Sequence, residues 1–206
     1  MKSGPLVMKA YIPALARMPF VARMPALLVL IALTIAIAPR AHAADSKVQP
    51  ARAPQFTARA ANDWINSAPR TIESYKGKVL LIDVWTFECW NCYRSFPWLK
   101  DVEARLGKRG LAVVGIHSPE FDRERDRQRV AAKTREFGIT HPVMIDNDFA
   151  YWKALDNQYW PAFYVIDRRG TIRGRFVGET HIGDRRAKQI ESLIETLLAE
   201  APDPAN

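Results

Sequence analysis

Cysteine is scarce in this chain of 206 residues, which has only Cys89 and Cys92, two residues apart. A closed zinc site needs four protein ligands, so the pair would require two further donors. The histidines that could supply them are isolated in the sequence and follow no metal-ligand spacing: His117, His141 and His181. We therefore expect no resident metal and no other cofactor. Copper handling by the two thiolates is kept as an alternative.

Acidic residues are absent ahead of Asp45, whereas basic residues precede a nearly uninterrupted apolar run of 13 residues from Ala26 to Ala38. A bilayer-spanning helix needs about 20 residues, so this run is short. The segment Ala41-His42-Ala43 then fits the small-x-small rule for leader cleavage. We predict a signal peptide over residues 1–43, cleaved after Ala43, and hence a periplasmic or secreted protein. An uncleaved membrane anchor is the alternative.

The formal charge of +8 comes mostly from this leader. Residues 1–43 hold five basic and no acidic residues, which leaves 25 basic and 22 acidic residues beyond them. The remaining charge of +3 is ordinary for a soluble surface, so it is no argument for nucleic-acid binding. We expect no nucleic-acid partner.

The chain beyond the leader is expected to form one domain. Large apolar residues are few over residues 44–61, which predicts a flexible lead-in with any order near Phe56. The domain is expected over 62–200, with a frayed tail over 201–206. Residues 78–85 are nearly continuously apolar, as in a strand covered on both faces, and Asp83 is the one charge inside the run. From Trp90 to Leu106, apolar residues recur every three or four positions, which predicts a helix.

Strands and helices are expected to alternate from there to the end of the domain. The expected strands lie at 111–116, 142–145, 162–166 and 171–177, with a short edge strand at 64–66; the expected helices lie at 122–137, at 149–155 and after the capping residue Asp184. The charged residues of 122–137, Glu124 among them, are interpreted as a solvated helix face. This order predicts an α/β sandwich around a central mixed sheet.

Several motifs now make the chain resemble the thioredoxin-like superfamily, in particular the exported TlpA-type oxidoreductases and the thioredoxin-like domain of DipZ-type proteins. They are Ile82-Asp83-Val84-Trp85 before Cys89-x-x-Cys92, His117-Ser118-Pro119-Glu120-Phe121, Tyr159-Trp160-Pro161-Ala162 and Val165-Ile166-Asp167-Arg168-Arg169-Gly170. The resemblance covers residues 62–199. It implies a thioredoxin-like three-layer sandwich with the strand–helix insert of the TlpA-type branch. Trp90-Asn91 replaces the Gly-Pro of thioredoxin, so the redox potential cannot be carried over.

The spacing of the two cysteines suits thiol–disulfide exchange, which needs a thiolate and a second thiol within reach. At a helix start, Cys89 lies at the exposed end, where backbone N–H groups and the helix dipole favour negative charge. We predict Cys89 as the nucleophile and Cys92, one turn deeper, as the resolving thiol of a redox-active disulfide. Glu88 precedes the nucleophile, and we hypothesise that its negative charge raises the pKa of Cys89 and makes the pair more reducing.

Three alternatives to this chemistry remain open beside copper handling. An exported protein can use the pair as a structural disulfide, although so short a loop restrains the unfolded chain little. A peroxidase is the second alternative, because Thr86-x-x-Cys89 is similar to a peroxiredoxin motif, but Ile82 stands where that motif has proline. The third is an interaction domain that uses neither cysteine.

The resemblance also implies roles for residues around the pair. Asp83 would lie beneath the cysteines and relay a proton to or from Cys92. Pro161 would be a cis-proline that faces the site and offers backbone groups to an extended substrate. Its neighbour Trp160 would contact substrate and sulfur. Trp90 and Glu88 complete the expected substrate-binding set, with Trp85 packed beside the site as scaffold.

The expected partners follow from the same resemblance. The substrates would be disulfides of other proteins. Because the 206 residues hold no third cysteine that could pass electrons internally, we expect a membrane thiol electron donor to recharge the pair.

Overall fold

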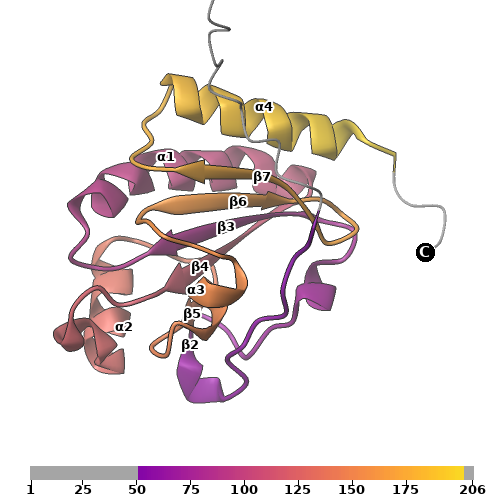
Figure 1. The fold of residues 1–206 in the computed structure, drawn as a ribbon. Coiled ribbons are helices and arrows are strands. Elements are labelled where there is room, and N and C mark those ends of the chain that lie inside the picture. The colour runs from indigo at the N-terminus through magenta and orange to yellow at the C-terminus, as the bar shows by residue number, and fades with distance from the viewer. Residues whose placement is uncertain (1–50, 202–206) are drawn as a thin grey trace, which may run out of the picture. The chain divides into compact units, whose positions relative to one another are not determined.

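A computed structural model describes residues 51–201 (Figure 1). The predicted signal peptide, its cleavage after Ala43, the first part of the lead-in and the tail beyond residue 201 lie outside the described residues. Within residues 51–201, no helix combines the length and the apolar character that crossing a bilayer requires.

A seven-stranded mixed sheet forms the middle layer of the fold. Its strand β3 (Val79–Trp85) pairs in parallel with β4 (Leu111–His117) and antiparallel with β6 (Ala162–Ile166). The outer strands are β5 (Val143–Ile145) and β2 (Trp64–Ile65) beyond β4, and β7 (Thr171–Val177) and β1 (Ala51–Arg52) beyond β6. The predicted mixed sheet is confirmed, and each predicted strand lies within one residue of its expected ends.

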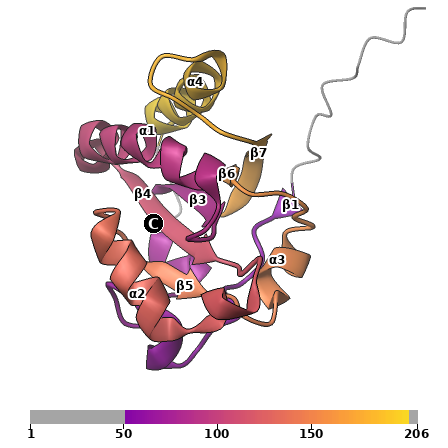
Figure 2. The ribbon, with the colours of Figure 1, turned by 90° about the vertical axis from the view of Figure 1, so that its left-hand side faces the viewer.

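Helices and turns cover both faces of the sheet. One core cluster contains residues of α1 (Trp90–Leu106), α2 (Arg127–Glu136) and α4 (Arg185–Ala199). The other contains residues of α3 (Ala150–Ala154) and the 3₁₀ turn η2 (Ile72–Tyr75). Figure 1 shows α1 and α4 on the same side of the sheet, and Figure 2 looks onto the end at which α1 begins. Shorter 3₁₀ turns are η1 (Ala61–Asp63), η3 (Gly107–Arg109) and η4 (Asp122–Arg125).

Strand β3 is buried along its whole length because both of its faces pack on apolar layers. Its odd-numbered residues Leu81 and Trp85 belong to the cluster that contains α1, whereas the even-numbered Ile82 and Val84 belong to the other cluster. Side chains alternate between faces along a strand. Asp83 therefore points to the α1 side of the sheet.

The single helix expected over 122–137 is wrong, since the chain forms η4 and then a separate helix α2. The break lies at Asp126, whose backbone is extended (φ −70°, ψ 110°) and whose side chain accepts hydrogen bonds from the N–H groups of Gln128 and Arg129. Aspartate in this position is a favoured helix N-cap, because it satisfies N–H groups that have no partner inside the helix. A new helix therefore starts at Arg127.

The structure brings residues 51–61 into the fold, ahead of the domain boundary expected at residue 62. Strand β1 pairs antiparallel with β7. Phe56 is 2% exposed and packs edge-on against Trp64, with a ring-centroid distance of 5.4 Å, and against Tyr151 at 5.3 Å. The described part of the expected flexible lead-in is therefore a packed segment, anchored by one aromatic side chain.

Candidate active site

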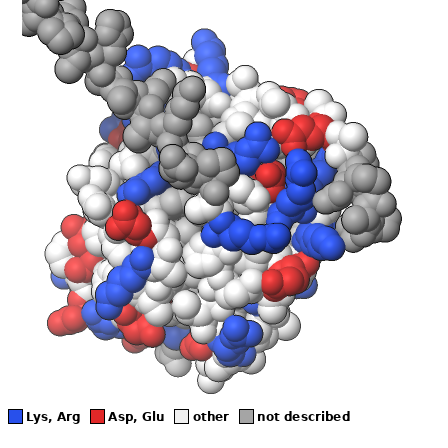
Figure 3. Space-filling model, turned by 45° about the vertical axis from the view of Figure 1, so that its right-hand side comes forward, with Lys and Arg blue, Asp and Glu red and all other residues white. Residues whose placement is uncertain are grey.

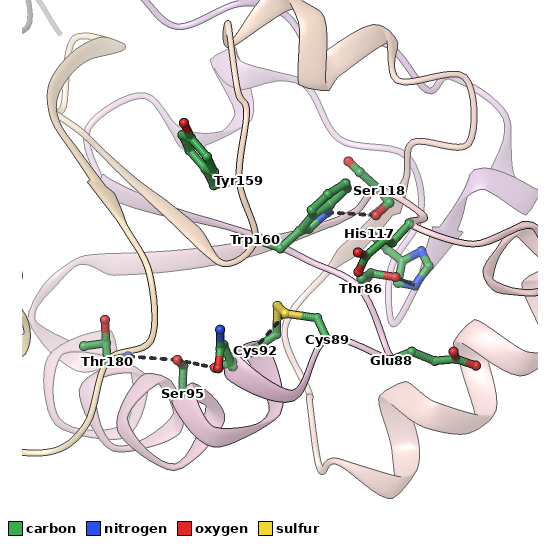
Figure 4. Close-up of a disulfide and its surroundings, with 12 residues drawn as sticks. Thr86, Glu88, Cys89, Cys92, Ser95, His117, Ser118, Tyr159, Trp160 and Thr180 are labelled. Atoms are coloured by element: carbon green, nitrogen blue, oxygen red, sulfur yellow. Dashed lines mark hydrogen bonds between the residues drawn. A yellow bond between two sulfur atoms is a disulfide. The ribbon is translucent and has the colours of Figure 1, made fainter.

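The two cysteines lie where β3 ends and α1 begins. Cys89 is the N-cap of α1 and is joined to Cys92 by a disulfide, with their Cα atoms 5.2 Å apart. The N–H group of Cys92 donates to Sγ of Cys89 at 3.1 Å (Figure 4). In the reduced protein, a donor in this position and the positive end of a 17-residue helix would both stabilise a thiolate on Cys89.

The two sulfur-bearing residues differ in their access to solvent. Cys92 is 1% exposed and belongs to the core cluster of α1, whereas Cys89 is only partly buried and packs at the edge of that cluster. A disulfide of another protein can therefore reach Cys89 but not Cys92. Attack from outside through Cys89 is the chemistry that this burial allows.

Asp83 is a buried carboxyl group on the same side of the sheet as Cys92. It is 2% exposed, and its Oδ2 atom has no hydrogen-bond partner among the described residues. Loss of hydration disfavours the charged form, which raises the pKa of Asp83 from 3.8 to about 8. The group is therefore protonated at neutral pH and titrates in the range in which thiols also exchange protons.

The segment Trp160–Pro161 forms a second wall of the site, and its peptide bond is cis. Figure 4 shows Trp160 across from the disulfide. The indole Nε1–H of Trp160 donates to the carbonyl oxygen of Ser118 at 3.0 Å, and its ring packs on Trp152 with a centroid distance of 4.2 Å. These two contacts hold the indole in place beside Cys89.

The remaining two tryptophans of the expected substrate-binding set have different environments. Trp90, directly after the nucleophile, is 65% exposed and stacks on Tyr93 with a centroid distance of 5.4 Å. Trp85 is completely buried and packs edge-on against Phe96 and His117. Trp90 is available to a substrate, while Trp85 supports the site from inside the core.

A shallow hollow of about 290 Å³ lies beside Cys89. Aromatic and acidic side chains line it, namely Phe87, Glu88, Trp90, Tyr93, Glu136 and Phe137. Apolar rings next to a reactive sulfur suit an apolar side chain of a protein substrate, because burying such a side chain is favourable.

Glu88 does not direct its charge at the nucleophile. Its carboxylate forms a two-pronged ion pair with Arg123, which lowers the pKa of Glu88. Figure 4 shows the side chain pointing away from the disulfide. The guanidinium of Arg123 therefore offsets the negative charge that was expected to raise the pKa of the Cys89 thiol.

Glu124 was assigned to a solvated helix face, and this assignment is wrong. The residue is completely buried and accepts four hydrogen bonds, one of them from the hydroxyl of Thr86 at 2.6 Å. The only sequence signal was a glutamate at the third position of η4, where it accepts the N–H group of the N-cap residue Phe121. The Thr86 hydroxyl, which the sequence pairs with Cys89 in the peroxiredoxin-like motif, donates its proton to Glu124.

The three histidines discussed above do not come together in space. His117 is completely buried, and burial lowers its pKa to about 3, so it is neutral at pH 7. His141 is buried against Glu103, with 3.0 Å between Nδ1 and Oε2, and His181 is exposed beside Glu179. Over residues 51–201, no group of three or more His, Cys, Asp or Glu side chains is placed to hold a metal ion.

A second hollow, of about 300 Å³, lies at the opposite end of β3, where the chain turns between β6 and β7. Arg52, Lys76 and Arg169 contribute to its lining, and Figure 3 shows basic side chains gathered on this side of the molecule. Its lining includes neither cysteine.

Comparison with known proteins agrees with this geometry. The AhpC/TSA family matches residues 50–175. Protein DipZ of Mycobacterium tuberculosis is 38% identical over 141 residues, which cover 67% of this chain but only 20% of DipZ. Thiol-disulfide oxidoreductase YkuV of Bacillus subtilis is 28% identical, and the alignment covers 71% of this chain and 94% of YkuV. The crystal structure of a thiol-disulfide isomerase from Corynebacterium glutamicum superposes with a TM-score of 0.60 at 23% identity, covering 72% of this chain and 98% of that one.

The raised pKa of Asp83 predicts a stability change in the Asp83→Asn variant. Between pH 3.8 and about 8 the folded protein holds a proton on Asp83 that the unfolded chain releases, so this group destabilises the fold increasingly as pH rises through that window. Asparagine does not titrate. We expect the variant to be more stable than the parent by about 1–3 kcal/mol at pH 7, and equal to it within about 0.5 kcal/mol at pH 4.

Urea unfolding of the oxidised protein at both pH values measures this difference. His117, whose depressed pKa makes stability fall as pH drops below 6.5, acts equally in parent and variant and cancels. The fully exposed Asp122 provides a control, since Asp122→Asn should change stability little at either pH. An Asp83→Asn variant that is no more stable than the parent at pH 7 would show that the carboxyl is ionised in the fold.

Proposed function

We propose that this chain, which belongs to the AhpC/TSA family and has a thioredoxin-like fold, is a thiol–disulfide oxidoreductase that reduces disulfides of other proteins outside the cytoplasm. One observation carries the proposal. A partly exposed sulfur at a helix N-cap is bonded to a buried one, and both lie across from the cis Trp160–Pro161 segment.

The reaction begins with the reduced pair. The Cys89 thiolate attacks one sulfur of the partner's disulfide, and a mixed disulfide forms while the partner's other sulfur leaves as a thiolate. The thiolate of Cys92 then attacks Sγ of Cys89 and releases the partner's second sulfur. Two electrons pass to the partner, and the enzyme ends with the Cys89–Cys92 disulfide.

Asp83 fits the second step of this reaction. Cys92 has to lose its proton inside the core, where water has little access. A carboxyl with a pKa of about 8 on the same side of the sheet can accept a proton when it is ionised and return it when the pair is reduced again. We propose Asp83 as this proton acceptor, acting directly or through one water molecule.

Substrate contact is proposed on both sides of Cys89. Trp90 and the aromatic hollow lie on one side, and Trp160 with Pro161 lies on the other. An extended peptide segment that runs past Pro161 could pair with backbone groups there in the manner of an added strand. Its cysteine would then be placed over Cys89.

A reductant must be recharged after each turnover. The 206 residues hold no third cysteine, so the electrons for Cys89–Cys92 come from a donor outside these residues. We propose a membrane thiol protein as that donor, which accords with an exported location.

Trapping tests the assigned roles of the two sulfurs. We expect the Cys92→Ser variant, treated with 5,5′-dithiobis(2-nitrobenzoate), to release one thionitrobenzoate and keep the other as a stable mixed disulfide on Cys89. The reduced parent should release two and end as the internal disulfide. The same variant should accumulate mixed disulfides with protein partners in extracts.

The matched control is Cys89→Ser, which leaves only the buried thiol and should react at least about tenfold more slowly, because access limits exchange. If Cys89→Ser traps partners and Cys92→Ser does not, then Cys92 is the nucleophile and Cys89 the resolving thiol. Failure of both variants to trap any partner would favour an interaction domain or a structural disulfide.

The proposed location depends on residues 1–43. N-terminal sequencing of the protein from the extracytoplasmic fraction of an expressing bacterium should show Ala44 as the first residue. An intact leader in the membrane fraction would establish the anchored alternative, and an intact leader in the cytosol would contradict export.

A further inference from the structure

Two loops meet at the edge of the sheet where the disulfide lies. Thr86 to Glu88 follow β3 and lead into Cys89, while Ser118 to Phe121 follow β4. The two strands are parallel, with Trp85 opposite His117, so both loops leave the sheet side by side. One backbone hydrogen bond continues the pairing past the strands, from the N–H of Ser118 to the carbonyl oxygen of Trp85 at 3.1 Å. Beyond it the two loop backbones do not pair with each other, so their relative position needs another source of support.

Glu124 supplies that support by dividing its two oxygens between the loops. Oε1 accepts the hydroxyl of Thr86 at 2.6 Å and the N–H of Glu88 at 2.9 Å. Oε2 accepts the N–H groups of Glu120 at 2.6 Å and Phe121 at 2.8 Å. A carboxylate is the one side-chain group that offers two acceptor oxygens without a donor. An amide of the same shape would present an NH₂ group to two donors of one loop.

The neutral imidazole of His117 extends this arrangement. The Thr86 hydroxyl proton is directed to Glu124, so the hydroxyl oxygen is the acceptor in its 3.3 Å contact with Nε2 of His117. Nε2 therefore carries the proton of this imidazole. The loop that leads to Cys89 is thus held from β4 as well as from Glu124.

The second loop continues to the opposite wall of the site. The carbonyl oxygen of Ser118 accepts the indole N–H of Trp160, and the Ser118 hydroxyl donates to the buried Asp146 at 3.0 Å. The segment from Ser118 to Phe121 is therefore hydrogen-bonded to Glu124 at one end and to Trp160 at the other, and so connects the nucleophile's loop with the cis-proline wall (Figure 4 shows the Ser118–Trp160 part).

We infer that Glu124 is a positioning residue, whose two oxygens set the alignment of Cys89 with the Trp160–Pro161 wall for protein substrates. This inference rests on the proposed function. A protein substrate has to contact Cys89 and this wall at once, whereas a small disulfide needs only the sulfur. Loss of the alignment should therefore slow exchange with proteins much more than exchange with small molecules.

The test compares two substrates in the Glu124→Gln variant. A misplacement of about 1 Å can lower a rate by about 100-fold, so we expect the rate constant for insulin disulfide reduction to fall by about 10- to 100-fold. The rate with 5,5′-dithiobis(2-nitrobenzoate) should stay within about threefold of the parent. The matched control is Asp167→Asn. This buried carboxylate accepts the N–H groups of Arg169 and Thr171 in the β6–β7 turn, at the far end of the sheet.

Asp167→Asn should lose thermal stability but keep both rates. If Glu124→Gln keeps its insulin rate, or if both variants lose both rates in proportion to their loss of stability, the inference is wrong. Failure of the parent protein to reduce insulin would instead contradict the proposed function, which separates the two failures.

A second pair of variants decides the matter if Glu124→Gln does not fold. Thr86→Val removes one of the four donors, and Thr86→Ser restores the hydroxyl that Glu124 binds. We expect the valine variant to lose about three- to tenfold in the insulin rate, and the serine variant to recover it. Equal insulin rates in the two variants would overturn the inference.

Discussion

The burial of β3 on both faces, with hydrogen-bonded neighbours along both edges, is the constraint on which the site depends. A strand held in this way cannot shift its register without moving a whole row of side chains from one core to the other. The point where β3 ends is therefore fixed, and with it the start of α1. Cys89 lies at that start and is partly buried, and Cys92 follows one turn deeper inside the core.

Three buried carboxyl groups near this edge of the sheet have different environments. Glu124 and Asp146 accept several hydrogen bonds each, and both hold loops that surround the disulfide. Asp83 has an oxygen without a partner, and burial keeps this group protonated at neutral pH. A carboxyl that is satisfied by donors stabilises structure, whereas Asp83, on the same side of the sheet as Cys92, has an unpartnered oxygen and keeps its proton.

Much of this architecture could be predicted from local patterns, and the failures have identifiable causes. The apolar run before Trp85 and the three- and four-residue spacing after Trp90 are strong signals, since each reflects a face that packs along its whole length. The charge alternation around Glu124 predicts a solvated face, and two of its four partners, in Thr86 and Glu88, come from a loop that no sequence pattern places nearby. The packing of residues 51–61 depends on contacts of Phe56 with Trp64 and Tyr151, which lie elsewhere in the chain and which no local pattern predicts.

Long-range pairing also explains the revised view of Glu88. The sequence predicts a negative charge next to the nucleophile, but Arg123, 35 positions away, binds that charge. The other residues that the resemblance implies have different positions around the disulfide. Trp160 lies across from the sulfur, and the Trp160–Pro161 bond is cis. Trp85 is buried in the core, and Trp90 is exposed at the surface.

The central claim is that Cys89 is the sulfur open to attack and that Cys92 is shielded. Limited alkylation of the reduced protein with iodoacetamide at pH 7, followed by peptide mass spectrometry, tests it most directly. The account predicts that label on Cys89 exceeds label on Cys92 by at least about tenfold in the first fraction of the reaction, because reactivity follows thiolate character and exposure. Equal labelling of the two cysteines, or earlier labelling of Cys92, would contradict it.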